Sequence, residues 1–368
     1  MTSTSYPQGP EDWKSVFIRQ LLIALADCPQ LRMHYWGPPG QLPDNTNYSC
    51  IPAEAAWLSW MMDMGGIIHL LRQKGLGRFY AALKLLFLLK RAYKRQNNVS
   101  LFHVNWLQNA LPLLGTTQPA LVSVLGSDFG LLKVPGMTTL LRYVLNKRRC
   151  ILAPNAEWMK GELEARFGDI AEIIPIPLGI NSHWFTINRE GLSLEKCKWL
   201  VVSRLTHKKI GPLFDWGRNI FTNNAKHELH LFGPMQEQLM IPDWVHYHGS
   251  THPQALCETW FPQATGLITL SQHDEGRPQV MLEAMAAGLP IIASNIPAHN
   301  NFIVHGQTGL LVESQKEFAQ GIQWLADPEN NRQIAGEARG WVKRVIGTWS
   351  DCAERYIEAY RMLLIGAE

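Results

Sequence analysis

The chain has 368 residues, of which 46% are hydrophobic and 18% are charged, with a formal net charge of +3. At about 150 residues per domain this length predicts two or three domains, and the ordinary composition excludes a disordered, collagen-like or disulfide-stapled protein. No apolar run approaches the ~20 residues of a membrane span and the polar first residues do not resemble a signal peptide, so we expect a cytoplasmic protein with reduced thiols.

The first half of the chain predicts an α/β domain in which strands and helices alternate. A turn over residues 6–13 and a helix over 14–26 come first, so the strand that usually precedes such a turn must be very short. Two prolines and a glycine over 174–181 are typical of a linker, so we place the first domain at residues 1–180. Further strands are predicted over 31–36, 101–106, 120–125, 150–153 and 173–176.

Charge is divided unevenly between the two halves. Residues 1–180 contain 18 basic and 12 acidic residues, whereas residues 181–368 contain 16 basic and 19 acidic ones. Between positions 64 and 156 the only acidic residue is Asp128. This asymmetry predicts an anionic partner for the first half.

Residues 76–95 are predicted to form a helix that is both basic and apolar. Side chains such as Phe79, Leu83 and Phe87 lie among six lysines and arginines. Such a helix suits an anionic membrane surface, which we expect to bind through residues 72–95. The alternative is a core helix with a solvated basic end. No nucleic-acid-binding motif is present, so we expect no nucleic acid partner.

The second half of the chain alternates strands and helices more cleanly. A helix is predicted over residues 279–287, and this order of elements predicts parallel strands in a doubly wound sheet over residues 181–349. In such sheets, ligands bind beyond the carboxyl ends of the strands. The predicted strands are 199–203, 228–232, 266–270, 291–294 and 309–312.

The most informative segment, residues 267–288, passes from a strand through a polar loop into a helix. Pro278 suits the first helical position, and Gly276 allows a ligand to approach the backbone closely. The free amides at the start of the helix suit a phosphate or diphosphate. Glu283 lies on an almost wholly apolar helix, where a carboxylate needs partners such as ribose hydroxyls. The alternative is that Glu283 points outward at a domain edge.

A second segment, residues 201–209, leads from a strand into a basic loop. Arg204 and Lys209 would lie at the carboxyl end of that strand, in the same domain as the helix site. Cations in this position can clamp a diphosphate leaving group. The alternative is a solvated basic loop.

Taken together, these segments resemble the retaining glycosyltransferases of family 4, which have the GT-B fold. The resemblance is carried by the glutamates Glu275 and Glu283, separated by seven residues, and by the basic pair Arg204 and Lys209. Further similar segments are 287–294 and 306–312, the strand over 101–105 and the Gly-Ser-Asp element that ends at residue 128.

The resemblance implies an α/β fold with two Rossmann-like doubly wound parallel-sheet domains facing a central cleft. Residues 1–180 would bind the acceptor, and a helix within 350–368 would complete this domain. Residues 181–349 would bind the nucleotide-sugar donor.

The resemblance also implies roles for individual residues. Arg204 and Lys209 would stabilise the departing nucleotide, Glu275 would contact the donor sugar, and Glu283 would hold the ribose. The family's N-terminal histidine is Leu125 here, so His103 or Asp128 would share its task. The remaining donor-binding residues would be Gly276, Arg277, Pro278 and Gly9.

We therefore expect a retaining hexosyltransferase that needs no metal or other cofactor and uses a UDP-sugar or GDP-sugar. It would act at the inner face of a membrane on a lipid-linked or cell-surface glycan acceptor, as in lipopolysaccharide synthesis. One alternative is a sugar-nucleotide-binding scaffold with weakened catalysis, which Leu125 and the short first strand suggest. Another is a sugar-nucleotide epimerase, which the basic and glutamate pairs disfavour.

Overall fold

The computed structural model describes residues 1–9, 12, 14–72, 77–126, 128–189, 195–273 and 276–365. The chain divides into unit 1, which comprises Met1–Leu178 and Trp349–Glu368, and unit 2, which comprises Gly179–Thr348. The divisions lie within two residues of the expected boundaries. Within the described ranges, no helix is long and apolar enough to cross a membrane.

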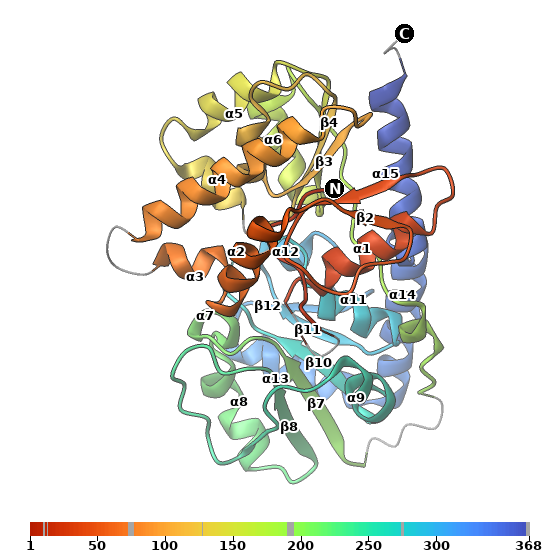
Figure 1. Ribbon diagram of the computed structural model, residues 1–368. Helices are drawn as coiled ribbons and strands as arrows, with labels where there is room; N and C mark the ends of the chain where they lie inside the picture. Colours follow the sequence, from red (N-terminus) through yellow and green to blue (C-terminus); the bar gives the residue numbers. More distant parts are fainter. Residues whose placement is uncertain are drawn as a thin grey trace. The chain divides into compact units, whose positions relative to one another are not determined.

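Parallel strands form the middle layer of unit 1 (Figure 1). Four of them have the order β3-β4-β5-β6, and β1 pairs separately with β2. The strands are β1 (Met33–Tyr35), β2 (Thr46–Tyr48), β3 (Phe102–Asn105), β4 (Ala120–Val124), β5 (Cys150–Pro154) and β6 (Glu172–Ile173).

The first residues of the chain join these two sheets. Thr2 forms parallel bridges to Trp36, next to β1, and to Val104 in β3. The Thr2 N–H donates to the carbonyl of His103 at 2.8 Å, and the Thr2 carbonyl accepts from the N–H of Asn105 at 3.1 Å. A very short N-terminal segment therefore takes the place of the first strand.

Helices cover both faces of the unit 1 strands. α1 and α15 pack with one set of strand residues and α2, α4, α5 and α6 with the other, so the layer separates two cores. Figure 1 shows α15, the last helix of the chain, lying beside α1, the first. The helices are α1 (Val16–Ala26), α2 (Pro52–Asp63), α3 (Ile67–Arg72), α4 (Gly77–Arg95), α5 (Met137–Leu145), α6 (Lys160–Phe167) and α15 (Trp349–Leu364), with 3₁₀ turns η1 (Leu107–Leu113), η2 (Phe129–Lys133) and η3 (Glu157–Met159).

A buried polar network ties α15 to the sheet. The two ring nitrogens of His103 share hydrogen bonds with the Tyr360 hydroxyl at 2.6 Å and the Ser123 hydroxyl at 2.9 Å. The Ser123 hydroxyl also bonds the hydroxyl of Tyr356 at 2.9 Å. Burial lowers the pKa of His103 well below its ordinary value, so the ring is neutral and one nitrogen donates while the other accepts.

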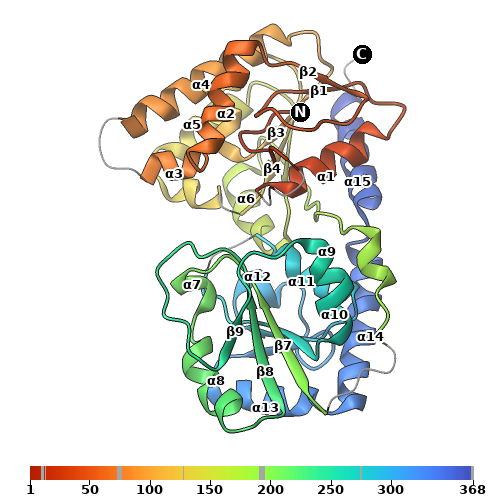
Figure 2. The ribbon, with the colours of Figure 1, turned by 60° about the horizontal axis from the view of Figure 1, so that its bottom comes forward.

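Unit 2 contains one parallel sheet with the strand order β12-β11-β10-β7-β8-β9 (Figure 2). Alternate side chains of β7 face opposite sides: Trp199 and Val201 pack with α8 and α13, whereas Leu200 packs with the core of α11 and α14. The unit is therefore doubly wound, as expected. The strands are β7 (Cys197–Val202), β8 (His227–Phe232), β9 (Val245–Tyr247), β10 (Gly266–Thr269), β11 (Ile291–Ser294) and β12 (Leu310–Val312).

The helices of unit 2 range from single turns to five turns. The single turns follow strands β7, β9 and β11, and the long ones cover the sheet. They are α7 (His207–Ile210), α8 (Leu213–Thr222), α9 (Pro253–Ala255), α10 (Phe261–Gln263), α11 (Gln279–Ala286), α12 (Pro297–Asn300), α13 (Gln315–Leu325) and α14 (Pro328–Val345), with η4 (Ser182–Thr186) and η5 (Leu256–Trp260).

Removing one hydroxyl from the buried network should destabilise unit 1. We expect Tyr360→Phe to lower the free energy of unfolding by about 1–3 kcal/mol, because a buried nitrogen of His103 loses its partner. Urea denaturation measures this change. Tyr143→Phe on α5 is the matched control, since that side chain is 55% exposed. Equal midpoints for the two variants would show that the network adds no stability.

Candidate functional site

The strand order of unit 2 reverses between β7 and β10. From β7 the chain adds β8 and β9 on one side, and it then crosses to add β10, β11 and β12 on the other. In open parallel sheets, ligands bind beyond the carboxyl ends of the strands at such a reversal. The loop after β7 carries Arg204 and Lys209, and the loop after β10 leads to Gly276. The two segments that the sequence singles out therefore lie at this point.

Backbone contacts hold these two loops together. The N–H of Gln272, after β10, donates to the carbonyl of Lys208 in α7 at 2.7 Å. Gly211, just after α7, has a φ of +54°, and a Cβ there would lie 2.1 Å from the carbonyl oxygen of Leu270. Only glycine fits such a close approach in this conformation. The basic loop is therefore fixed against the end of β10.

The basic pair presents positive charge beside this junction. Arg204 is exposed, and its guanidinium makes no hydrogen bond or ion pair with any described residue. Lys209 is half-buried on α7, and its backbone N–H donates to the Thr206 side chain at 3.3 Å. The carboxylate of Glu237 accepts the His207 N–H of this loop at 2.8 Å. Arg204 is thus available to an anionic ligand.

The helix after β10 positions Glu283. α11 begins at Gln279, one residue later than expected, with Pro278 immediately before it. Met281, Leu282, Ala284 and Met285 are buried, whereas Glu283 is half-buried and has no hydrogen-bond or ion-pair partner among the described residues. Burial raises the pKa of Glu283 to about 8.

Glu283 is partly enclosed by protein and partly accessible. Its carboxyl group is crowded by protein yet keeps accessible surface, so it can accept hydrogen bonds from a ligand. Such bonds would favour the ionised form that burial disfavours.

Neighbouring side chains hold the start of α11. The Arg277 guanidinium lies over the ring of Phe302 at 5.6 Å, and the Gln279 side-chain amide donates to the Gly179 carbonyl at 2.7 Å. Gly276 is buried. Glu275, predicted to contact the donor sugar, lies outside the described residues.

In unit 1, Asp128 forms hydrogen bonds with the residues that follow two neighbouring strands. Its carboxylate accepts the N–H of Leu107, after β3, at 2.9 Å and the N–H of Leu125, after β4, at 3.0 Å. Burial raises its pKa to about 6, although these bonds oppose the rise. Trp106, directly before Leu107, has a φ of +69°. A left-handed backbone in a non-glycine residue is a strained conformation, and no sequence pattern signals it.

The other two unit 1 candidates have different surroundings. Both ring nitrogens of His103 are bonded within the protein, so these contacts give it the task of holding α15 and leave no nitrogen for a ligand. The Gly9 carbonyl accepts the Asp12 N–H at 3.2 Å, and a Cβ at Gly9 would meet no atom within 4 Å. The space beside Gly9 is large enough for a ligand atom, but its size alone does not indicate which ligand would bind there.

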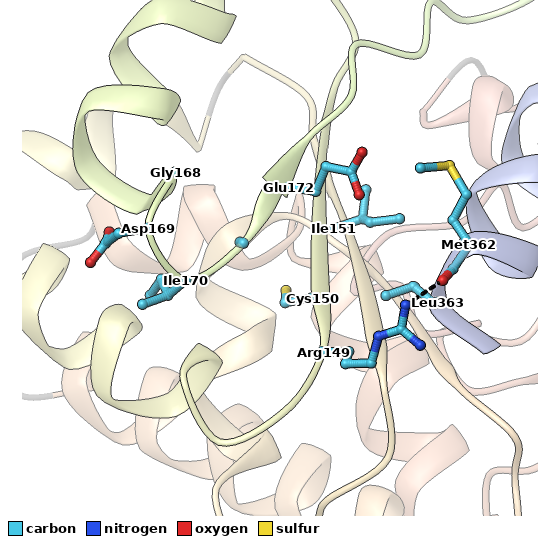
Figure 3. Close-up of a pocket in the computed structure, with 10 residues that line it drawn as sticks. Arg149, Cys150, Ile151, Gly168, Asp169, Ile170, Glu172, Met362 and Leu363 are labelled. Carbon is cyan, nitrogen blue, oxygen red and sulfur yellow. Dashed lines mark hydrogen bonds between the residues drawn. The ribbon is translucent and has the colours of Figure 1, made fainter. Parts of the chain in front are cut away.

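A cavity of about 350 Å³ lies elsewhere in unit 1 (Figure 3). Its lining includes Arg149, Cys150 and Glu172, at the amino ends of β5 and β6, and Met362 of α15. This is the opposite end of the strands from the one where ligands of parallel sheets bind. The cavity contains none of the predicted site residues.

Comparison with known proteins finds similarity mainly in the second half of the chain. Residues 197–327 match the family described as Glycosyl transferases group 1. The spore coat protein SA of Bacillus subtilis is 30% identical over 149 residues, which are 39% of this chain and 37% of that protein. A D-inositol 3-phosphate glycosyltransferase of Rhodococcus opacus is 28% identical over 116 residues, 31% of this chain and 25% of that protein. The chain thus matches between a quarter and about a third of these relatives.

Solved structures share the fold over nearly the whole chain. Sucrose-phosphate synthase from Thermosynechococcus elongatus has a TM-score of 0.71 at 19% identity and covers 96% of this chain and 94% of its own. HepE from Anabaena, solved with UDP-glucose, has a TM-score of 0.64 at 15% identity and covers 99% and 98%. The fold of the chain is therefore the GT-B α/β fold with parallel sheets.

The raised pKa of Glu283 predicts a specific pH dependence. The unfolded carboxyl ionises near pH 4.5 and the folded one near pH 8, so this group lowers the stability of unit 2 progressively as pH rises between these values. The effect is at most about 5 kcal/mol. We expect Glu283→Gln to gain stability relative to the parent between pH 5.5 and pH 8.

Urea denaturation at several pH values measures the difference between variant and parent. Glu337→Gln, an exposed glutamate of α14, is the control and should show no such trend. A pH-independent difference for Glu283→Gln would contradict the environment described for this carboxyl group.

Proposed function

We propose that the protein transfers a sugar from a nucleoside diphosphate sugar to a glycan, starting from the match of residues 197–327 to the family described as Glycosyl transferases group 1. The observation that carries the proposal is the reversal of strand order between β7 and β10, where a backbone contact joins the basic loop to the segment that follows β10. A diphosphate needs cations, and a ribose needs a hydrogen-bond acceptor. At this edge of the unit 2 sheet, Arg204 and Lys209 would supply the cations and Glu283 the acceptor.

Each residue of this edge would have a distinct role in donor binding. Arg204 and Lys209 would neutralise the charge that develops on the diphosphate as the glycosidic bond breaks. Glu283 would accept hydrogen bonds from the ribose hydroxyls, and this would offset its unfavourable ionisation. The backbone at Gly276 would allow close approach of the donor, and Glu275 would contact the sugar. These side chains would supply the charge that a metal supplies in other transferases, so we propose transfer without a metal. Retention of configuration is proposed from the resemblance to the retaining glycosyltransferases alone.

The donor would be a UDP-sugar or a GDP-sugar. HepE, which shares the fold, was solved with UDP-glucose, and this supports a nucleotide-sugar donor of that kind. We propose a lipid-linked or cell-surface glycan acceptor at the inner face of a membrane. The support is the cationic character of unit 1 between residues 64 and 156.

A sugar-nucleotide-binding scaffold is the second candidate. Leu125 replaces the family's histidine, and the nitrogens of His103 are bonded to Ser123 and Tyr360. If catalysis were weakened, the donor would still bind at unit 2 but no transfer would follow.

Nucleotide binding distinguishes a working donor site from a merely similar fold. We expect UDP or GDP to raise the thermal stability of the protein in the presence of EDTA, since a ligand at 100 times its Kd adds about 2.7 kcal/mol. Glu283→Ala should lose this shift, and Glu337→Ala should keep it. No shift with UDP, GDP or ADP would contradict the donor site.

Transfer itself is tested with the basic pair. We expect Lys209→Ala to lower kcat by about a hundredfold or more, because a charge-stabilising donor is lost. Lys208→Ala, its exposed neighbour, is the matched control. Product analysis from a radiolabelled sugar nucleotide measures the rate, and a near-normal rate for Lys209→Ala would refute the assignment. Binding without transfer to any acceptor would favour the scaffold.

A further inference from the structure

The outer face of α4 is apolar where a surface helix is usually polar. The inner face of this helix is buried in the core of unit 1 through residues such as Leu85 and Leu89. A helix of this kind normally presents polar side chains on its other face. Instead, Phe79, Tyr80, Leu83 and Phe87 are 55%, 64%, 67% and 57% exposed. Single exposed apolar residues are ordinary, but a continuous stripe indicates a partner.

Basic residues continue the same stripe. At about 100° per residue, Leu83, Phe87, Arg91 and Lys94 follow one another along one face of the helix. The Arg91 guanidinium lies 5.8 Å from the centre of the Phe87 ring. The stripe is therefore apolar in the first half of α4 and cationic in the second.

Helix α2 extends this surface. The Lys84 ammonium group lies 5.1 Å from the ring centre of Trp57 on α2 and 5.6 Å from that of Tyr80. Trp57 also contacts the ring of Trp60, which is 47% exposed. Figures 1 and 2 both show α2, α3 and α4 lying together in unit 1. We define the α4 patch as Trp60, Phe79, Tyr80, Leu83 and Phe87 with Lys84, Lys90, Arg91 and Lys94.

Acidic residues do not neutralise the α4 patch. The described parts of α3 and α4 contain none, and Asp128 is buried and accepts backbone N–H groups. The acidic residues of α2 are Glu54 and Asp63. Asp63 accepts a hydrogen bond from Gln8 at 3.2 Å.

Glu54 removes one expected cation from the surface. Its carboxylate binds the Arg95 guanidinium through two bonds of 2.7 and 2.6 Å and also accepts the Trp36 indole N–H at 3.0 Å. Arg95 therefore belongs to a half-buried ion pair and not to the α4 patch.

We propose that the α4 patch inserts into the interface of a membrane rich in anionic lipid. Exposed aromatic and aliphatic side chains would enter the boundary of the acyl chains, while Lys90, Arg91 and Lys94 would meet the lipid phosphates. The proposal combines the two interpretations of residues 76–95. One face of α4 packs in the core of unit 1, and the other would lie in the membrane interface. The inference deepens the proposed function, since it names the surface that would bring unit 1 to a lipid-linked acceptor.

Vesicle flotation of the full chain tests the proposal. We expect the protein to bind equimolar phosphatidylglycerol and phosphatidylcholine vesicles and to bind pure phosphatidylcholine vesicles much less. Leu83→Ser with Phe87→Ser should lower the bound fraction about tenfold at low salt and also in about 0.5 M NaCl, because apolar insertion is not screened. Met240→Ser in unit 2, at a side chain that is 94% exposed, is the matched control.

The basic residues are tested separately. Lys90→Gln, Arg91→Gln and Lys94→Gln together should weaken binding mainly at low salt, and they leave the Arg95–Glu54 pair intact. All of these side chains are exposed, and circular dichroism melting checks that the variants fold. The assay contains neither donor nor acceptor, so loss of transfer activity and loss of vesicle binding are measured independently.

Three results would overturn the membrane proposal. One is that the parent protein does not bind the anionic vesicles. Another is that the Leu83 and Phe87 double variant binds them as well as the parent does. The third is a concentration-dependent dimer in sedimentation velocity that the double variant abolishes, without vesicle binding, because the α4 patch would then be covered by a second copy of the chain.

Discussion

The parallel pairing of β7 with β10 is the contact on which the candidate site depends. It lies where the strand order of unit 2 reverses, so the loops that leave the two strands must run side by side. The bond from Gln272 to Lys208 and the close approach of Gly211 to Leu270 then fix their separation. These backbone contacts position Arg204, Lys209 and the segment that leads to α11.

Ionising Glu283 beside this strand reversal lowers the stability of unit 2. Glu283 has no partner among the described residues, and its raised pKa measures how strongly the protein disfavours its ionised form. Arg204 likewise makes no ion pair within the described part of the chain. In unit 1, by contrast, Glu54 is bonded to Arg95 and Trp36, and Asp128 to two backbone amides. Glu283 and Arg204 thus lack partners of the kind that Glu54 and Asp128 have, and this is the pattern expected of a binding site.

Local patterns in the sequence predicted much of the fold and part of the site. The apolar runs of β4, β7, β8, β10 and β11 and the helices α4, α11 and α15 were found because burial imposes their periodicity. The three-residue strands β2 and β9 were not predicted, since such short segments carry too few apolar residues. Contacts between distant residues were also missed. The hydrogen bonds of His103 to Tyr360 and of Arg95 to Glu54 depend on tertiary packing, which no local pattern encodes.

The return of α15 to unit 1 has a consequence for the order of folding. Unit 2 is a continuous segment, whereas the core around α1 lacks its last helix until residue 349 and beyond have been made. On a ribosome, unit 2 can therefore complete its own core while one face of the unit 1 sheet is covered by α1 but still lacks α15. The hydrogen bond between His103 and Tyr360 closes a loop of 257 residues, so it can form only after residue 360 has been made.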